Sequence, residues 1–273
     1  MGENVSPRHS PRRTMTIQTG ELAPGRLPQD GPGRTAIRAH ELRKVYGQGD
    51  TAVAALDGVS VDFGVGRFTA IMGPSGSGKS TLMHCLAGLD TPTSGQVLLG
   101  ETELTQLPDA ALTKIRRDRI GFVFQSFNLL PMLTAKDNIL LPLELGNRKP
   151  DQQWMATLID VLGLQDRLTH RPSELSGGQQ QRVAVARALV GRPEVVFADE
   201  PTGNLDSRSG AEVLGFLRRS VREFGQTVVM VTHDPLAASY ADRVVMLADG
   251  KLAGELTDPT PESVLGALRQ LGA

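Results

Sequence analysis

The sequence predicts an α/β fold built on a mostly parallel sheet, and three observations lead to this prediction. Short and almost entirely apolar runs at residues 68–72, 195–198 and 228–231 are typical of parallel strands that are buried on both faces. Segments with helical spacing of apolar residues separate these runs. The first run leads directly into a glycine-rich loop and then into a helical segment at 79–88.

In chain order, the first half of the fold follows from the spacing of apolar residues. Leu82, Leu86 and Leu89 are expected on one side of the first helix. The predicted elements are strands near residues 37–45 and at 59–63, 68–72, 96–99 and 120–124, and helices at 79–88 and near 109–118.

The second half begins with a block of little strand character, which we expect to form a separate helical lobe. Its helices are predicted at 134–144 and 151–162, and a third is expected to open at Gln179. No internal repeat is present in the sequence. The remaining predicted elements are strands at 195–198, 228–231, 244–247 and 252–256, and helices at 207–224 and 261–271.

Residues 1–34 differ from the rest in being rich in Pro, Gly and Arg and poor in large apolar residues. Such a segment cannot offset its own ordering entropy, so we expect a flexible tail. A basic arm for a membrane surface is one interpretation. An overlong start, with translation beginning at Met15, is the other.

The composition excludes several classes of protein. The 273 residues are 40% apolar and 22% charged, with a formal net charge of −1, which argues against a surface built for nucleic acid. Cys85 is the only cysteine, so no intramolecular disulfide can form and a reducing compartment is favoured. No run of about 18 apolar residues and no apolar signal-peptide core occurs. We therefore expect any work at a membrane to pass through a separate partner chain.

The glycine-rich loop matches the pattern G-x-x-x-x-G-K-[ST]. Its glycines let successive backbone N–H groups point at one phosphate group, and the following helix directs its positive end to the same place. Lys79 is expected to bridge the β- and γ-phosphates of ATP, and the Ser80 hydroxyl to bind Mg²⁺. A glycine-rich turn with an exposed lysine is the alternative. The predicted nucleotide-binding residues of the loop are Gly73, Pro74, Ser75, Gly76, Ser77, Gly78, Lys79, Ser80 and Thr81.

Two carboxylates end the strand at 195–198. A buried Asp199 would be costly without a partner, and Mg²⁺, reached through a water, is the natural one. Glu200 follows at the carboxyl end of the strand, where open α/β sheets bind ligands. An ordinary acidic pair at a strand end is the alternative interpretation.

A second candidate anion site precedes the helix expected at Gln179. Ser176, Gly177 and Gly178 supply a hydroxyl and backbone groups there. The phosphate loop, this segment and the acidic pair, in this order and at these separations, resemble the ATPase subunit of an ABC transporter over about residues 42–252. The resemblance implies an α/β P-loop NTPase core, an N-terminal antiparallel β subdomain and a helical subdomain at about residues 126–190, all within residues 35–273.

The resemblance also implies roles for single residues. Glu200 is similar to the catalytic glutamate that polarises the attacking water, and His233 to the switch histidine that contacts the γ-phosphate. Gln125 is similar to the Q-loop glutamine, which reaches Mg²⁺ or the attacking water. Tyr46 matches the aromatic residue that stacks on adenine, although it could instead be a packed strand residue. The expected catalytic set is Glu200, His233, Gln125 and Lys79, and Tyr46 is expected to bind the nucleotide.

For assembly, the resemblance implies a head-to-tail dimer around two MgATP. In it, Ser176, Gly177, Gly178 and Gln179 close over the nucleotide of the opposite subunit, and Asp206 lies in the D-loop along the seam. The implied partners are a second copy or a paralogous ATPase subunit, and an integral membrane permease. No nucleic acid is expected, and the place of work is the cytoplasmic face of the membrane.

Residues 53–56, 115–125 and 127–131, together with Asn138, resemble one branch of the family. That branch contains the macrolide-export, lipoprotein-release and cell-division ATPases, which implies export or transmission of force. ABC-type ATPases that act on DNA or ribosomes are the alternative. The sequence has no coiled-coil insertion between Lys79 and Ser176 and contains one cassette, and both observations argue against this alternative.

Overall fold

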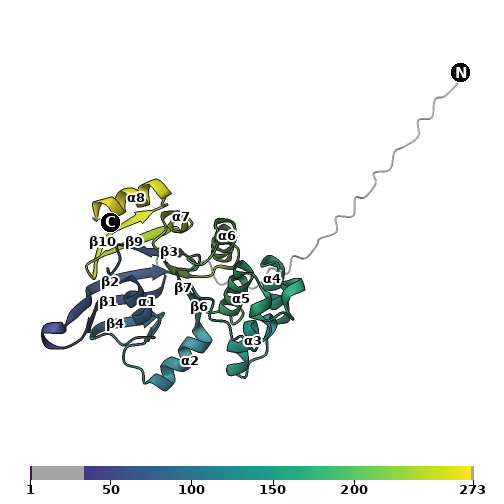
Figure 1. Cartoon of the computed structure of the whole chain (residues 1–273), viewed down its shortest axis with the longest axis horizontal. Coiled ribbons are helices and arrows are strands. Elements are labelled where there is room, and N and C mark those ends of the chain that lie inside the picture. The colour runs from purple at the N-terminus through teal and green to yellow at the C-terminus, as the bar shows by residue number, and fades with distance from the viewer. Residues whose placement is uncertain (2–33, 272–273) are drawn as a thin grey trace.

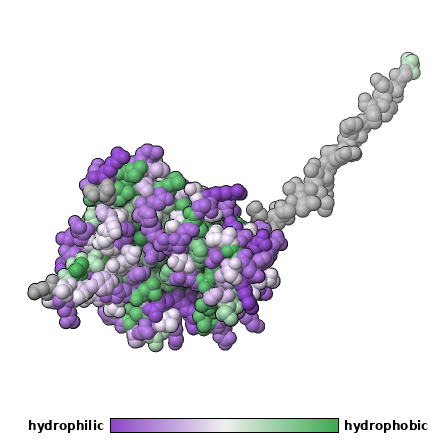
Figure 2. All heavy atoms as spheres, in the orientation of Figure 1, coloured by the Kyte–Doolittle hydropathy of each residue, from purple (hydrophilic) through white to green (hydrophobic). Residues whose placement is uncertain are grey.

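The computed structural model describes residue 1 and residues 34–271 (Figure 1). The tail expected over residues 1–34 lies outside the described residues, except for Met1 and Arg34. The remainder of the chain forms two sheets with helices packed against them. None of the helices in the described part of the chain is long and apolar enough to cross a membrane. On the face shown in Figure 2, hydrophobic residues are interspersed with hydrophilic ones.

The N-terminal sheet is antiparallel and has the strand order β2-β1-β4-β5. Its first strand alternates between buried residues such as Ile37 and Ala39 and exposed residues such as Arg38, as expected for a strand with one face in the core. Its strands are β1 (Thr35–Tyr46), β2 (Val53–Gly64), β4 (Ser94–Leu99) and β5 (Thr102–Glu103).

The second sheet has the order β10-β9-β3-β8-β7-β6, and all its pairings are parallel except β9 with β10. Every residue of β3 and β8 is buried, which explains their continuous apolar runs. The mostly parallel sheet and the antiparallel N-terminal sheet confirm the predicted fold class. The strands are β3 (Phe68–Met72), β6 (Ile120–Phe124), β7 (Val195–Asp199), β8 (Val228–Val231), β9 (Arg243–Ala248) and β10 (Lys251–Thr257).

The helices cover both faces of this second sheet. Helix α1 lies between the two sheets, whereas α5 and α6 pack on the opposite face (Figure 1). The helices are α1 (Lys79–Leu86), α2 (Asp109–Arg119), α3 (Ala135–Leu145), α4 (Gln152–Val161), α5 (Gly177–Leu189), α6 (Ser207–Phe224), α7 (Pro235–Ala238) and α8 (Pro261–Gln270).

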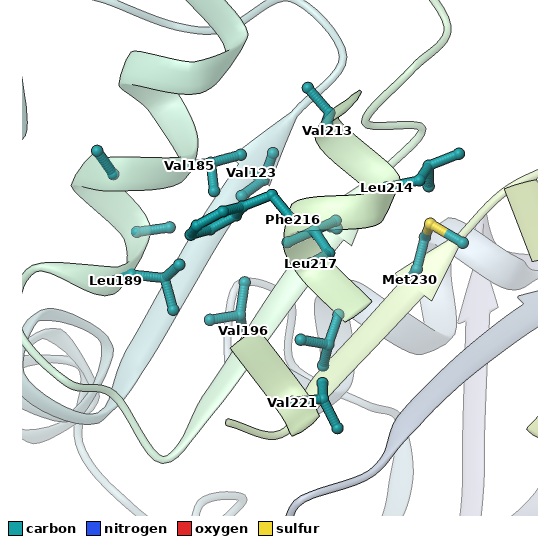
Figure 3. Packing of buried hydrophobic residues seen from close by; sticks show 14 of the residues in the cluster. Val123, Val185, Leu189, Val196, Val213, Leu214, Phe216, Leu217, Val221 and Met230 are labelled. Atoms are coloured by element: carbon teal, nitrogen blue, oxygen red, sulfur yellow. The ribbon is translucent and has the colours of Figure 1, made fainter. Parts of the chain in front are cut away.

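Two hydrophobic clusters hold the layers together, one on each face of the second sheet. Ile71 and Phe197 belong to the cluster beneath the N-terminal sheet, while Phe68 belongs to the cluster beneath the helices. Figure 3 shows Phe216 of α6 between α5 and the sheet, close to Leu189 and Val196. Helix α5 lies close to β6 because Gly121 has no side chain: a Cβ there would be 2.4 Å from the Ala188 carbonyl oxygen.

Two local expectations need correction. Helix α5 begins at Gly177, two residues before Gln179, because Ser176 caps it. The placement of Leu89 beside Leu82 and Leu86 was wrong. Leu89 is 46% exposed, since α1 ends at Leu86 and Gly88 turns the chain with a φ of 63°.

Candidate functional site

The site residues expected after four different strands lie at one edge of the second sheet. Gly73 follows β3, Gln125 follows β6, Glu200 follows β7, and His233 comes two residues after β8. These four strands are adjacent and parallel, so their carboxyl ends meet at the same edge. This is the edge at which open α/β sheets bind ligands.

The glycine-rich loop has a backbone conformation that residues with side chains could not adopt without strain or clashes. Gly73 has a φ of 152°, and a Cβ at this position would be 1.9 Å from the Leu247 carbonyl oxygen. Gly78 has a φ of 98° and serves as the N-cap of α1 without any side-chain cap. The Leu82 amide, bonded to Gly78 O at 2.8 Å, is the first in α1 to have a backbone partner among the described residues. The amides of the preceding turn are therefore available to an anion.

Two further side chains of the loop fit a phosphate ligand. The Lys79 Nζ donates to the carbonyl oxygens of Gly73 and Pro74 at 2.9 and 2.8 Å, so the ammonium lies over the loop. Burial lowers the pKa of Lys79, against the opposing effects of Glu200 and Asp199. The buried Ser77 hydroxyl has no hydrogen-bond partner among the described residues. Ser75, Gly76 and Ser80 are exposed, while Pro74 and Thr81 are half-buried.

At the end of β7, Asp199 is half-buried, and its carboxylate makes no hydrogen bond or ion pair with the described residues. Burial raises the pKa of its carboxyl, and the neighbouring Glu200 adds to this while His84 and Lys79 oppose it. A cation would relieve the cost of this charge. Within the described part of the chain, no group of three or more His, Cys, Asp or Glu could hold a metal. Asp199 and the exposed Ser80 hydroxyl thus fit a Mg²⁺ that completes its coordination with phosphate and water oxygens.

Glu200 and His233 form a hydrogen-bonded pair. The Glu200 Oε1 lies 2.8 Å from the His233 Nδ1. Glu200 has a φ of 46°, in the left-handed region, which costs a non-glycine residue about 1–2 kcal/mol. Its amide donates to Val231 O at 2.9 Å, so β8 helps to hold this conformation. Strain of this kind persists where the surroundings over-determine it and is common at functional sites.

Gln125 is tied to the loop that follows Glu200. Its Nε2 donates to Asn204 Oδ1 at 3.3 Å, and Asn204 Nδ2 donates to Gln125 O at 3.1 Å. Its side chain also packs against the Cα of Gly203. Asn204 was not expected to have this role. The sequence places it 79 positions from Gln125 and offers no signal for the pairing.

Tyr46 ends β1 and is 45% exposed. Its hydroxyl donates to Asp90 Oδ2 at 2.6 Å. The Lys44 Nζ lies 4.8 Å from the ring centroid and donates to Asp90 Oδ1 at 2.6 Å. Lys44 and Asp90 thus fix the ring at the edge of the N-terminal sheet. Neither residue was anticipated. Lys44 lies two positions before Tyr46 on the same strand, whereas Asp90 follows α1 and reaches Tyr46 only when α1 packs under β1.

Ser176 and Gln179 form a reciprocal cap at the start of α5. Gln179 N donates to Ser176 Oγ at 3.3 Å, and Ser176 N donates to Gln179 Oε1 at 2.9 Å. Gly178 lies against the first turn of α6, where a Cβ would be 2.7 Å from Ser209 Oγ. Asp206 caps α6 by accepting from the Arg208 and Ser209 amides, both at 3.0 Å. Bonds from Ser209 lower the pKa of Asp206.

The two expected phosphate-binding segments, residues 73–80 and 176–178, are here called the first and second cradle. They belong to different parts of the chain. Helix α1 contacts β1, β2, β4 and β8, whereas α5 contacts α3, α6 and β6 (Figure 1). Gly177 has Phe127, Leu205 and Asn204 as its neighbours. The second cradle therefore lies among the helices, apart from the loop that precedes α1.

A strand, glycine loop and helix with Lys79 share one sheet edge with the carboxylates that end β7, two strands away from β3. This arrangement defines a P-loop ATPase site. The sequence pattern of the ABC transporter family matches residues 56–203. The lipoprotein-releasing system ATP-binding protein LolD of Geobacter metallireducens is 48% identical over 221 residues, which cover 80% of this chain and 98% of that protein. The macrolide export ATP-binding/permease protein MacB of Marinobacter nauticus is 43% identical over 88% of this chain.

A solved structure of an ABC-type cassette has the same fold. The ATP-binding cassette MJ0796 of Methanocaldococcus jannaschii, described as dimeric and bound to ADP and Pi, has a TM-score of 0.74 and 41% identity, and the match covers 81% of this chain and 98% of that chain. The chain therefore belongs to the ABC transporter family and carries its ATPase domain. It spans 37% of the length of the Marinobacter nauticus relative.

Proposed function

We propose that this chain binds MgATP between two copies arranged head to tail and hydrolyses it to drive a membrane permease. One observation carries the proposal: the Ser176–Gly178 cradle is placed among the helices, away from the complete loop at residues 73–80. A single nucleotide needs only one such loop, so the second cradle is available to the nucleotide of a partner subunit. The dimeric MJ0796 structure supports this arrangement.

In this proposal each side chain has a distinct task. Lys79 and the loop amides bind and orient the phosphates, and Tyr46 stacks on the adenine. Glu200 orients the attacking water, while His233 holds its carboxylate through the 2.8 Å contact. A Mg²⁺ held by Ser80, Asp199 and Gln125 would neutralise charge that develops on the phosphates. To bind Mg²⁺, Gln125 would first give up its hydrogen bond to Asn204. Because Asn204 lies two residues before Asp206, this exchange would link the nucleotide site to the D-loop.

The proposed permease contact is a groove of about 380 Å³ beside the residues that follow Gln125. Its apolar wall includes Phe122 and Phe124, whose rings stack 5.6 Å apart. Arg187 of α5 also lines the groove and donates to Asn128 O and Phe127 O, at 2.6 and 2.9 Å. Burial lowers the pKa of Arg187, and no carboxylate pairs with it in the described part of the chain.

A segment that fits this groove would be amphipathic, with apolar residues against the phenylalanines and a carboxylate for Arg187. We assign it to a cytoplasmic loop of the permease. The helical block at about residues 126–190 would then transmit movement between this loop and the nucleotide. The LolD and MacB relatives favour a permease of an export or force-transmitting system at the cytoplasmic face of the membrane.

The test uses Glu200→Gln, which keeps the shape of the side chain but removes its charge. We expect it to bind ATP, to hydrolyse it at least about 100-fold more slowly and to accumulate as a dimer, because the nucleotide that joins the subunits persists. Size-exclusion chromatography with MgATP measures the dimer, with MgADP as the control. A variant that elutes only as a monomer with MgATP would contradict the proposal.

A further inference from the structure

Gln181 of α5 is a glutamine with an unusual environment. It is fully buried, with 0% of its surface exposed, although it lies on the helix that carries the Ser176 cap. Its Nε2 donates to Pro201 O at 2.5 Å and to Phe124 O at 3.3 Å. Its Oε1 is buried and has no partner among the described residues. Burying an amide with an unpaired oxygen costs free energy. This cost is offset where the hydrogen bonds of the amide fix the positions of the segments around it.

The two acceptors belong to the segments that carry the hydrolytic side chains. Phe124 ends β6 and directly precedes Gln125, and Pro201 directly follows Glu200. One carboxamide thus joins α5 to both strand ends. Ser176 lies on the same rigid helix, five residues earlier or about 1.4 turns. A displacement of the Ser176 cradle would therefore reach both strand ends through a single side chain.

The restraint at Pro201 matters because Glu200 has a left-handed backbone, with a φ of 46°. Non-glycine residues rarely adopt this conformation, so neighbouring bonds must hold it. The Glu200 amide is fixed by Val231 O on one side, and the Gln181 bond to Pro201 O fixes the following residue on the other.

We propose that Gln181 is a positioning residue for ATP hydrolysis, which couples the Ser176 cradle to the placement of Glu200 and Gln125. This inference rests on the proposed function. Gln181 itself touches neither the nucleotide loop nor the reacting groups. Its loss should therefore reduce the rate of the chemical step and leave the affinity for ATP almost unchanged.

The chain offers a matched control in Gln226. This glutamine is also buried, at 7% exposure, and its Nε2 donates to the carbonyl oxygens of Pro193 and Thr227 at 3.0 and 3.2 Å. It precedes β8, so it ties strands together at the amino edge of the sheet, opposite the site. A purely structural role for buried glutamines predicts the same consequences at both positions.

The experiment compares Gln181→Met with Gln226→Met in the full chain, by steady-state ATP hydrolysis and thermal unfolding. We expect Gln181→Met to lower kcat about 10- to 100-fold with KM for ATP within about twofold, as for a small misplacement of catalytic groups. We expect Gln226→Met to keep kcat within about twofold despite a similar fall in Tm. Equal kcat for the two variants, or a loss confined to KM, would overturn the proposal.

If Gln181→Met does not fold, Gln181→Glu is used to test the coupling. A glutamate can donate to a carbonyl only when protonated, and burial raises its pKa. Relative to wild type and Gln226→Glu, the kcat of Gln181→Glu should therefore fall more steeply between pH 6 and pH 8. Parallel pH profiles would refute the coupling. The ATPase rates of wild type and Glu200→Gln are measured in the same experiment. Equal rates for these two would contradict the proposed function itself.

Discussion

Asp199 and Glu200 are neighbours in the sequence, but their side chains have different surroundings. The Asp199 carboxylate is half-buried, has no hydrogen-bond partner among residues 34–271, and has a pKa that burial raises. Glu200 instead contacts His233. A carboxylate without a partner favours a cation, whereas a held carboxylate can orient a water. Two identical functional groups can in this way take the separate roles proposed for them.

Asp90 provides a residue-level prediction about pH. Although burial acts in the opposite direction, hydrogen bonds from Lys44 and Tyr46 lower the pKa of its carboxyl. A carboxyl with a lowered folded-state pKa contributes stability above its unfolded pKa of about 3.9 and loses it as the pH falls through the folded value. Asp90→Asn should therefore reduce the free energy of unfolding by about 1–3 kcal/mol at pH 7, and by less as the pH falls below 4.

Urea unfolding of wild type and Asp90→Asn at a series of pH values measures this difference. Asp109→Asn serves as the control because the Asp109 side chain is 90% exposed. We expect this control to change stability little at any pH. A difference between wild type and Asp90→Asn that stays constant, or grows on acidification, would show that the ion pair does not stabilise the fold.

Among the elements, α5 and α6 pack against each other and make a close approach at their first turns. Ser176 and Asp206 cap the two helices, and Gly178 makes the close approach possible. The loop that holds Asn204 passes between them and reaches Gln125. The position of the second cradle is therefore set by contact between two helices, and the position of Gln125 depends on the same junction.

Gly178→Ala tests this junction. The added Cβ would lie 2.7 Å from Ser209 Oγ and 2.9 Å from Ser209 Cβ, so the first turn of α5 must shift. We expect ATP hydrolysis to fall about 10-fold or more while nucleotide binding is retained. Ser209→Gly removes both clashing atoms and should restore much of the rate in the double variant.

Gly215→Ala is the matched control, since a Cβ on this helical glycine would have no atom within 4 Å from the rest of the described chain, apart from its own helix backbone and its chain neighbours. We expect it to leave the ATPase rate unchanged and to stabilise α6 by about 1 kcal/mol. Failure of Ser209→Gly to restore the rate of Gly178→Ala would contradict the packing explanation and place the effect at the bound phosphate.

For the whole molecule, the separation of α1 and α5 has the largest consequence. Helices α1 and α5, which follow the two cradles, lie on opposite faces of the second sheet, so a head-to-tail pair of chains could bring the cradle of one to the loop of the other. Under the proposed function, neither chain then has a complete site of its own.

Mixing two inactive variants tests this prediction. Lys79→Ala lacks the loop lysine, and Ser176→Arg should still bind nucleotide but not hydrolyse it. A mixed dimer holds one site with Lys79 from one chain and Ser176 from the other. Because half of randomly mixed dimers contain both chains, an equal mixture should recover roughly a quarter of the wild-type rate.

The double variant that carries both substitutions in one chain, mixed with wild type, is the control for subunit exchange. ATPase assays of each variant alone and of the equal mixture give the result. An equal mixture of the single variants that stays inactive, although the chains are shown to exchange, would mean that both groups act within one subunit.

Local signals in the sequence were sufficient to predict most strands and helices, but not the short β5 and α7 or the first half of β2. The runs that became β3 and β8 are apolar because both their faces are covered, and Gly73 and Gly78 stand where only glycine fits. These features leave a local pattern in the sequence, although the groups that require glycine are distant in sequence, such as the Leu247 carbonyl beside Gly73. The expected roles of Glu200, Gln125 and His233 stay predictions that the experiments above address.

Other features could be recognised only in the folded molecule. Gln181 is the last of three consecutive glutamines in a polar run that Arg182 continues and that resembles a solvated helix surface, yet packing against two strand ends buries it. The pairing of Gln125 with Asn204 and the burial of Arg187 also depend on chain segments that are far apart in sequence. The order of motifs, by itself, determined which chemistry this chain can carry out. Only the tertiary structure decided which polar groups are buried and what they bond to, because burial and pairing depend on how distant segments pack.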